Sequence, residues 1–197
     1  TQTQIMMGHP GIDVHHPDFF PLMVANNAFG GGFTSRLMNE VRVKRGWSYG
    51  AYSWYGPKKM AGEFTMWVFP AAKETMETLE LMISLYKDYV KNGVTREEFE
   101  RSKSNLINEF AFKIDTPKKW VGQLVTMSLM GLPDDYLDTY QDKLRAVTYE
   151  AAVSAVQRQA DPQNLLVAMV CTANQFQKTV KKLGKDIHVS TKPYTAD

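Results

Sequence analysis

Two aromatic-rich runs separated by a turn constrain the fold of this chain more than any other feature. Residues 47–55 and 62–69 are rich in Trp, Tyr and Phe, which favour extended strands. Gly56 and Pro57 begin the segment between them, and both residue types are typical of turns. The pattern predicts an antiparallel hairpin against which the remaining segments must pack.

Segments with helical periodicity surround this hairpin in the sequence. Apolar residues recur at helical spacing, and the predicted helices cover residues 18–29, a short stretch from Thr34 to the stop at Gly46, residues 71–92, a helix from Thr95, a helix from Pro117 to Gly131, and residues 136–146, 149–160 and 174–183. Thr95 and Glu98 form a capping box at the start of one of them. Strands are predicted at residues 3–8 and at 164–172, the latter buried and carrying Cys171 as a small buried residue. This order predicts an α+β fold, with a mostly antiparallel sheet and helices packed mainly on one face.

Composition limits the classes of partner. With 197 residues and 44% apolar content, the chain is long enough for one domain with its own core, and residues 1–197 are expected to form that single domain. The net charge of +2 argues against nucleic acid as a partner, and no apolar run approaches the ~20 residues of a membrane span. A single cysteine excludes an internal disulfide. Because the chain starts at Thr1 directly before a strand, we expect it to be a piece of a longer protein.

The histidines do not form a metal-binding motif. His9, His15, His16 and His188 complete neither H-x-x-E-H nor H-E-x-x-H. His15 and His16 are neighbours whose side chains diverge in an extended or loop segment, so they are expected to be surface residues. The sequence therefore predicts no metal or cofactor in this chain, although a zinc site with ligands scattered along the sequence stays an alternative.

Two other catalytic patterns are not supported. Glycines 30–32 precede a predicted helix, as a phosphate-binding loop does, but such a loop follows a strand and these glycines follow a helix. They also lack the Lys-Ser/Thr of that loop, so a turn between two helices is the better interpretation. Ser35, Ser48 and Ser53 have no histidine in a motif that would activate them as nucleophiles. A nucleotide site and serine hydrolysis are both disfavoured.

Arg42 and Tyr49 are the candidate site residues. A short helix containing Arg42 ends at Gly46, and Tyr49 lies where the next strand is expected to start. Both side chains donate hydrogen bonds, which suits an oxygen that gains negative charge during a reaction. A solvated helix arginine and a packed strand aromatic are the plain alternatives. The helix stop between the two residues favours a functional pair.

The segment GGGFTSRLMNEVRVKRGWSY at residues 30–49 closely resembles the non-catalytic, C-terminal half of insulinase/pitrilysin-type zinc metallopeptidases, which include the mitochondrial processing peptidases and bacterial zinc proteases. The opening QIMMGHPG at residues 4–11 and the EEFERSK run at 97–103 are similar to the same family. The resemblance covers nearly the whole chain, and the segment at residues 30–49 is its most specific part.

The resemblance implies a peptidase built from two halves. In this family the other half carries H-x-x-E-H and a distant glutamate that bind zinc, so zinc is expected in a catalytic half on the same polypeptide or a separate subunit. The zinc-free half closes over the peptide substrate, with Arg42 and Tyr49 reaching the substrate. This chain alone is then expected to be inactive. A non-enzymatic scaffold or core subunit of the same fold is the rival interpretation.

Overall fold

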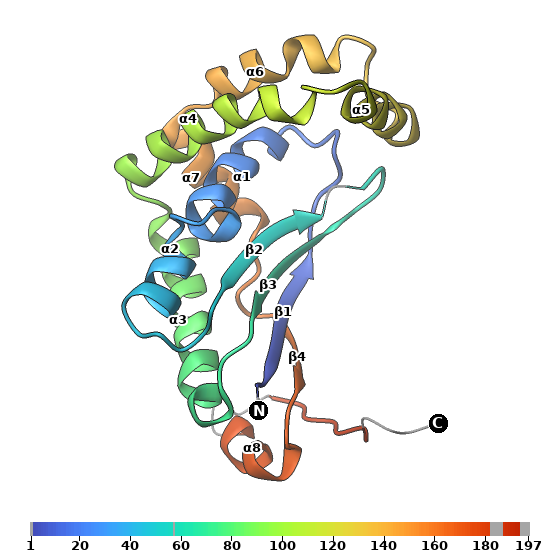
Figure 1. Ribbon diagram of the computed structural model, residues 1–197. Coiled ribbons are helices and arrows are strands. Elements are labelled where there is room, and N and C mark those ends of the chain that lie inside the picture. The colour runs from blue at the N-terminus through green and yellow to red at the C-terminus, as the bar shows by residue number, and fades with distance from the viewer. Residues whose placement is uncertain (1, 57, 182–186, 194–197) are drawn as a thin grey trace.

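A four-stranded antiparallel sheet forms one layer of the molecule, and helices cover one of its faces (Figure 1). The computed structural model describes residues 2–56, 58–181 and 187–193. The sheet has the order β2-β3-β1-β4, with strands β1 (Gln4–Pro10), β2 (Ala51–Gly56), β3 (Glu63–Val68) and β4 (Leu166–Val170). The α+β prediction is confirmed.

The helices follow the periodic segments of the sequence. In chain order they are α1 (Phe19–Asn26), the π-helical turn η1 (Asn27–Gly31), α2 (Arg36–Met38), the π-helical turn η2 (Asn39–Val43), the 3₁₀ turn η3 (Ala72–Glu74), α3 (Thr75–Asn92), α4 (Arg96–Lys113), α5 (Pro117–Met130), α6 (Tyr136–Ala146), α7 (Tyr149–Gln159) and α8 (Ala173–Val180). The predicted capping box is present, since Glu98 N–H donates to Thr95 Oγ1 and Thr95 N–H donates to the Glu98 carboxylate. The last helix was predicted to reach residue 183, and residues 182–183 lie outside the described part of the chain.

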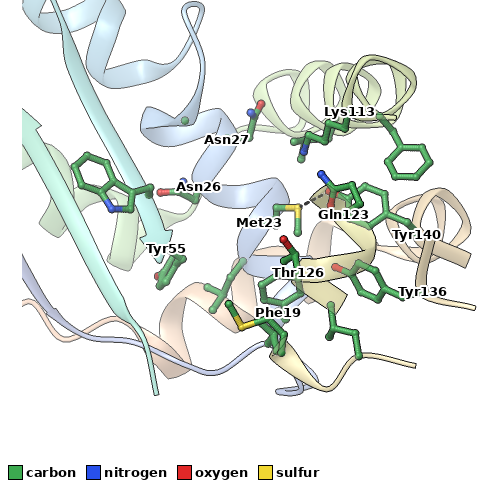
Figure 2. Close-up of a pocket in the computed structure, with 18 of the residues that line it drawn as sticks. Phe19, Met23, Asn26, Asn27, Tyr55, Lys113, Gln123, Thr126, Tyr136 and Tyr140 are labelled. Carbon is green, nitrogen blue, oxygen red and sulfur yellow. Dashed lines mark hydrogen bonds between the residues drawn. The ribbon is translucent and has the colours of Figure 1, made fainter. Parts of the chain in front are cut away.

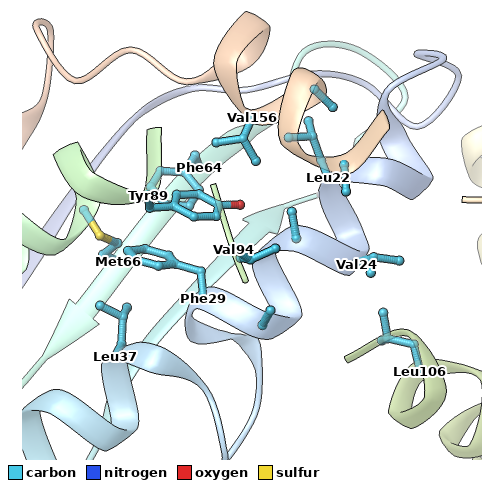
Figure 3. Close-up of a cluster of buried hydrophobic side chains, with 14 of the residues drawn as sticks. Leu22, Val24, Phe29, Leu37, Phe64, Met66, Tyr89, Val94, Leu106 and Val156 are labelled. Atoms are coloured by element: carbon cyan, nitrogen blue, oxygen red, sulfur yellow. The ribbon is translucent and has the colours of Figure 1, made fainter. Parts of the chain in front are cut away.

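Alternation along the strands separates the core from the open face of the sheet. Ile5 of β1 lies opposite Val68 of β3, and Met7 lies opposite Met66; all four side chains are buried against the helices. The core continues into the helical layer (Figure 3), where the rings of Phe29 and Tyr89 stack with centroids 4.2 Å apart. The predicted hairpin is β2 paired antiparallel with β3. Pro57, which was predicted to lie in the turn, is outside the described residues.

Buried polar contacts join the end of α1 to strand β2. Asn26 Nδ2 donates to the Ser53 carbonyl at 3.1 Å, and Ser53 Oγ donates to Asn26 Oδ1 at 2.7 Å. Gly30 lies against the same residue, because a Cβ at position 30 would be 2.3 Å from Ser53 Oγ. The prediction of a turn at all three glycines is wrong in part, because Gly30 and Gly31 continue the helical segment as η1 and the chain becomes extended at Gly32. Ser53 has a structural partner in Asn26.

The prediction of a buried strand at residues 164–172 is wrong in its burial. Leu166 is 77% exposed and Val170 is 55% exposed, because β4 lies at the edge of the sheet and, among the described strands, pairs with β1 alone. Cys171 was predicted as a buried strand residue, but it follows β4 and is half-buried. An apolar run shows that a strand is present, while its place in the sheet decides how far it is covered.

Candidate functional site

The π-helical turn η2 places Arg42 on the outside of the molecule. Ser35 caps α2, with Met38 N–H donating to Ser35 Oγ. Leu37 and Val41 are completely buried and fasten this helical segment to the core, so Arg42 faces outward and is half-exposed. π-helical turns are rare and often occur at functional sites, and both η1 and η2 are close in sequence to the candidate residues.

Gly46 ends this segment as predicted. Its φ is +65°, a left-handed conformation that favours glycine, and its N–H donates to the Arg42 carbonyl at 3.0 Å. The strand was predicted to begin at Trp47, but β2 begins at Ala51. Tyr49 therefore lies in the connection between the helical turn and the strand, not in the strand itself.

Ser48 explains why the connection is not a strand. Its side chain is buried, and its Oγ accepts from Phe69 N–H at 3.2 Å and donates to the Gly50 carbonyl at 2.7 Å. These bonds replace ladder pairing next to the end of β3 and hold residues on either side of Tyr49. Tyr49 is 71% exposed, and the hydrogen bonds of Ser48 hold the backbone on either side of it.

The structure brings Arg42 and Tyr49 into direct contact. Arg42 Cζ lies 4.2 Å from the centroid of the Tyr49 ring and 4.9 Å from that of Phe33. Phe33 is 66% exposed and was not identified from the sequence. The available signal in the sequence was the position of Phe33 directly after three glycines. An aromatic residue at such a position lies outside a regular helix and need not belong to the core.

Charges near the pair leave Arg42 without a carboxylate. Glu40 forms ion pairs with Lys44 Nζ at 2.5 Å and with Arg45 Nη1 at 2.7 Å. The hydrogen bond from Lys44 is the main cause that holds the pKa of Glu40 below its ordinary value. Within the described residues, the Arg42 guanidinium has ring contacts and no hydrogen-bond acceptor. Its N–H donors are available to a ligand.

The histidines are dispersed. His9 is buried and its Nε2 lies 2.5 Å from Tyr86 Oη, whereas His15 is exposed with Nε2 3.0 Å from the Met130 carbonyl oxygen. The described part of the chain contains no group of three His, Cys, Asp or Glu side chains that could hold a metal ion. Zinc therefore does not fit the residues described here.

A separate cavity of about 590 Å³ lies between β2 and helices α1, α4, α5 and α6 (Figure 2). Phe19 and Met23 of α1 and Tyr136 and Tyr140 of α6 line it, with Tyr140 Oη 3.2 Å from Met23 Sδ. Phe33, Arg42 and Tyr49 are not among its lining residues. The sequence placed the lining residues of α1 and α6 only within predicted helices. It contained no sign of a cavity, because the volume depends on how the four helices pack.

Residues 1–106 match the family described as the peptidase M16 inactive domain. The chain belongs to this family. The matched range includes the whole of the segment that holds Phe33, Arg42 and Tyr49, and the fold is that of an inactive, C-terminal M16 domain.

Known proteins similar to this M16 domain are longer than the chain. It is 24% identical over 169 residues to an uncharacterized zinc protease YmxG of Bacillus subtilis, covering 86% of this chain and 41% of the relative. A non-peptidase homolog YmxG of Helicobacter pylori is 21% identical over 141 residues, 72% of this chain and 33% of that protein. The crystal structure of a peptidase M16 inactive domain from Pseudomonas fluorescens superposes with a TM-score of 0.78 at 31% identity, covering 85% of this chain and 40% of that one.

None of the helices in the described ranges is long and apolar enough to cross a membrane.

Proposed function

We propose that this M16 domain is the substrate-closing half of a zinc-dependent peptidase and that Arg42 and Tyr49 contact the peptide. The contact between the half-exposed Arg42 and the exposed Tyr49, 4.2 Å from guanidinium carbon to ring centroid, is the observation that carries the proposal. Zinc and the water that it activates belong to the other half, in the same polypeptide or in a partner subunit. The zinc protease relative, more than twice as long as the aligned segment, supports this division.

The roles of the two residues follow from their chemistry. Tyr49 presents an exposed hydroxyl donor, which stabilises a scissile carbonyl oxygen as that oxygen gains negative charge. Arg42 has free N–H donors in a planar group, which suit the carbonyl oxygens of a peptide backbone. Phe33 and Tyr49 contact the guanidinium and limit its orientations, so Arg42 loses less conformational entropy when it binds.

The scaffold alternative makes a different prediction for the same residues. The name of the Helicobacter pylori relative, a non-peptidase homolog, shows that the fold is also associated with proteins described as non-catalytic. A scaffold needs no exposed guanidinium that lacks an acceptor. Kinetic constants of site variants therefore separate the two functions.

The test uses the full-length or reconstituted two-part enzyme and an unstructured peptide substrate. We expect Tyr49→Phe to lower kcat by about 10²–10³, since this is the usual effect of losing one donor to a developing oxyanion. Arg42→Ala should raise KM as well, because a grip on the ground-state backbone contributes uniform binding. Both variants should keep the wild-type melting temperature.

A matched control is available for the arginine. Arg96 also lies over an aromatic ring, with its Cζ 4.4 Å from the centroid of Tyr149, but it is on α4 and pairs with Glu150. Arg96→Ala should leave kcat and KM unchanged. Wild-type kinetics in both the Arg42 and Tyr49 variants would leave the scaffold function as the better account.

A further inference from the structure

The cavity between β2 and helices α1, α4, α5 and α6 has a polar side and an apolar side. Asn27, Lys113 and Gln123 lie toward the upper part of the view in Figure 2, and Phe19 lies toward the lower part with Thr126 and Tyr136, whose hydroxyl groups are the polar atoms there. A volume of about 590 Å³ is in the range of small-ligand sites, which are mostly apolar with a few placed polar groups. The division indicates an amphipathic occupant.

The polar side chains retain unused hydrogen-bonding groups. Asn27 Oδ1 accepts from Ser102 Oγ at 2.9 Å, while its amide nitrogen has no acceptor in the described residues. Gln123 has no hydrogen bond within the described ranges, so its amide group can both donate and accept. Lys113 Nζ lies 5.7 Å from the centroid of the Tyr140 ring and has no carboxylate partner there.

The charge of the lining is one-sided. Among the described residues, Lys113 is the lysine of the lining, and no Asp or Glu lines the cavity. Lys113 forms no ion pair within the described residues, although Glu109 lies four residues before it on α4 and its charge acts on Tyr140. An unpaired ammonium favours an anionic ligand group that it can hydrogen-bond directly. The free donors of Asn27 and Gln123 add to this preference.

The apolar side selects the rest of the ligand. Its walls are aromatic and aliphatic side chains contributed by four helices and β2, among them Phe19, Phe110 and Met127. Such walls bind bulky apolar groups by removing their surface from water. The amide oxygen of Gln123 can accept a hydrogen bond from the N–H of a peptide group. A fatty acid has no such N–H donor.

We propose that this cavity binds the free carboxyl end of a short apolar peptide. The terminal carboxylate lies against Lys113 and Asn27, the last peptide group meets Gln123, and the apolar side chains fill the space toward Phe19 and Tyr136. The site is separate from Arg42 and Tyr49, so the proposal does not depend on their role.

Isothermal titration calorimetry of the 197-residue chain tests the ligand chemistry. The probes are acetyl-Leu-Phe with a free carboxylate, the same dipeptide with a carboxamide end, and decanoate. We expect the free acid to bind and the carboxamide to bind about five- to tenfold more weakly, as expected for one partly solvated charge-assisted contact. Decanoate should bind more weakly than the free acid.

Three variants connect binding to the cavity. Lys113→Gln should remove the difference between acid and carboxamide, whereas Lys118→Gln, an equal charge change on α5 outside the lining, should keep it. Thr126→Trp places an indole in the cavity from an exposed helix position and should abolish binding while the circular dichroism spectrum stays unchanged.

Four outcomes would overturn the proposal. They are an absence of binding by the free acid, equal binding of acid and carboxamide, an unaltered preference in Lys113→Gln, and tighter binding of decanoate than of the peptide. The last outcome would reassign the cavity to a fatty carboxylate.

Discussion

Gly93 and Gly46 both end helical segments with positive φ, yet their surroundings differ. Gly93 has φ +73° and ψ −157°, a region that is essentially restricted to glycine, and a Cβ there would be 2.8 Å from Val153 Cγ2. Gly46 has φ +65° with no atom within 4 Å of the same position. The sequence predicted a stop at Gly46 and the end of a helix at residue 92, directly before Gly93, but only packing distinguishes the two glycines.

We expect Gly93→Ala to lower the free energy of unfolding by about 2–4 kcal/mol, through backbone strain and the contact with Val153. Gly46→Ala should cost about 1 kcal/mol, because only the left-handed backbone is penalised. Urea unfolding of both variants measures the difference. Equal losses would show that the contact with Val153 relaxes without cost.

Arg36 joins three chain segments that the sequence did not connect. Its guanidinium donates to the Glu98 carboxylate at 3.0 and 2.6 Å, to Asp88 at 3.1 Å and to the Gly93 carbonyl at 3.1 Å. Burial alone would raise the pKa of Glu98, but the hydrogen bonds from Arg36 and Thr95 outweigh burial and lower it. The carboxylate form is therefore favoured by folding.

A lowered pKa gives a defined acid response. The stability from Glu98 is complete above its ordinary pKa of about 4.5 and is lost as the pH falls through the lowered value. We expect Glu98→Gln and Arg36→Gln each to make the acid part of the stability–pH curve shallower than in wild type. Thermal unfolding between about pH 2 and pH 6 tests this, and a wild-type slope in both variants would contradict it.

The sequence predicted both ends of helix α5 correctly, but it did not indicate how exposed the apolar side chains of this helix are. Thr116 caps it, Pro117 is its first residue and Gly131 ends it with φ +68°. Its apolar residues nevertheless remain largely in solvent, with Val121 56% and Leu129 69% exposed. Local chemistry determines helix ends, whereas burial depends on which other surfaces are present.

The exposed position of α5 permits a simple stabilising change. Gly122 lies inside this helix, and a Cβ there would have nothing within 4 Å. We expect Gly122→Ala to raise the free energy of unfolding by about 0.5–1 kcal/mol, because alanine loses less backbone entropy in a helix. Chemical denaturation measures it, and a destabilised variant would mean that α5 is not helical in solution.

At the scale of the whole molecule, the sequence predicted the fold class and most elements from local patterns. It also placed Arg42 and Tyr49 close together, through a helix stop between them. It did not predict Phe33 in the same cluster, because the local path of the chain between Phe33 and Arg42 decides that contact. It did not predict the cavity, because the lining residues are distant in sequence and meet only in the fold. The predicted burial of β4 was wrong because the cover of a strand also depends on segments that are distant in sequence.

The absence of a ligand cluster among the described residues has a direct consequence for metal content. A catalytic zinc needs about three protein ligands in fixed geometry. We expect the isolated chain to fold, to retain no stoichiometric zinc after dialysis and to cleave no peptide. Metal analysis by mass spectrometry and a chelator-controlled peptide assay test this, and zinc near one equivalent with chelator-sensitive cleavage would contradict it.

Strand β4 leaves one side of its backbone without a strand neighbour in the described part of the chain. Its five residues, LVAMV, carry neither lysine nor proline to discourage pairing with another strand. At high concentration two copies of the chain could therefore continue one sheet across both molecules. Oligomers joined through β4 would grow by backbone hydrogen bonding without unfolding the core. A lysine introduced at Ala168 of β4 would oppose this pairing by charge repulsion.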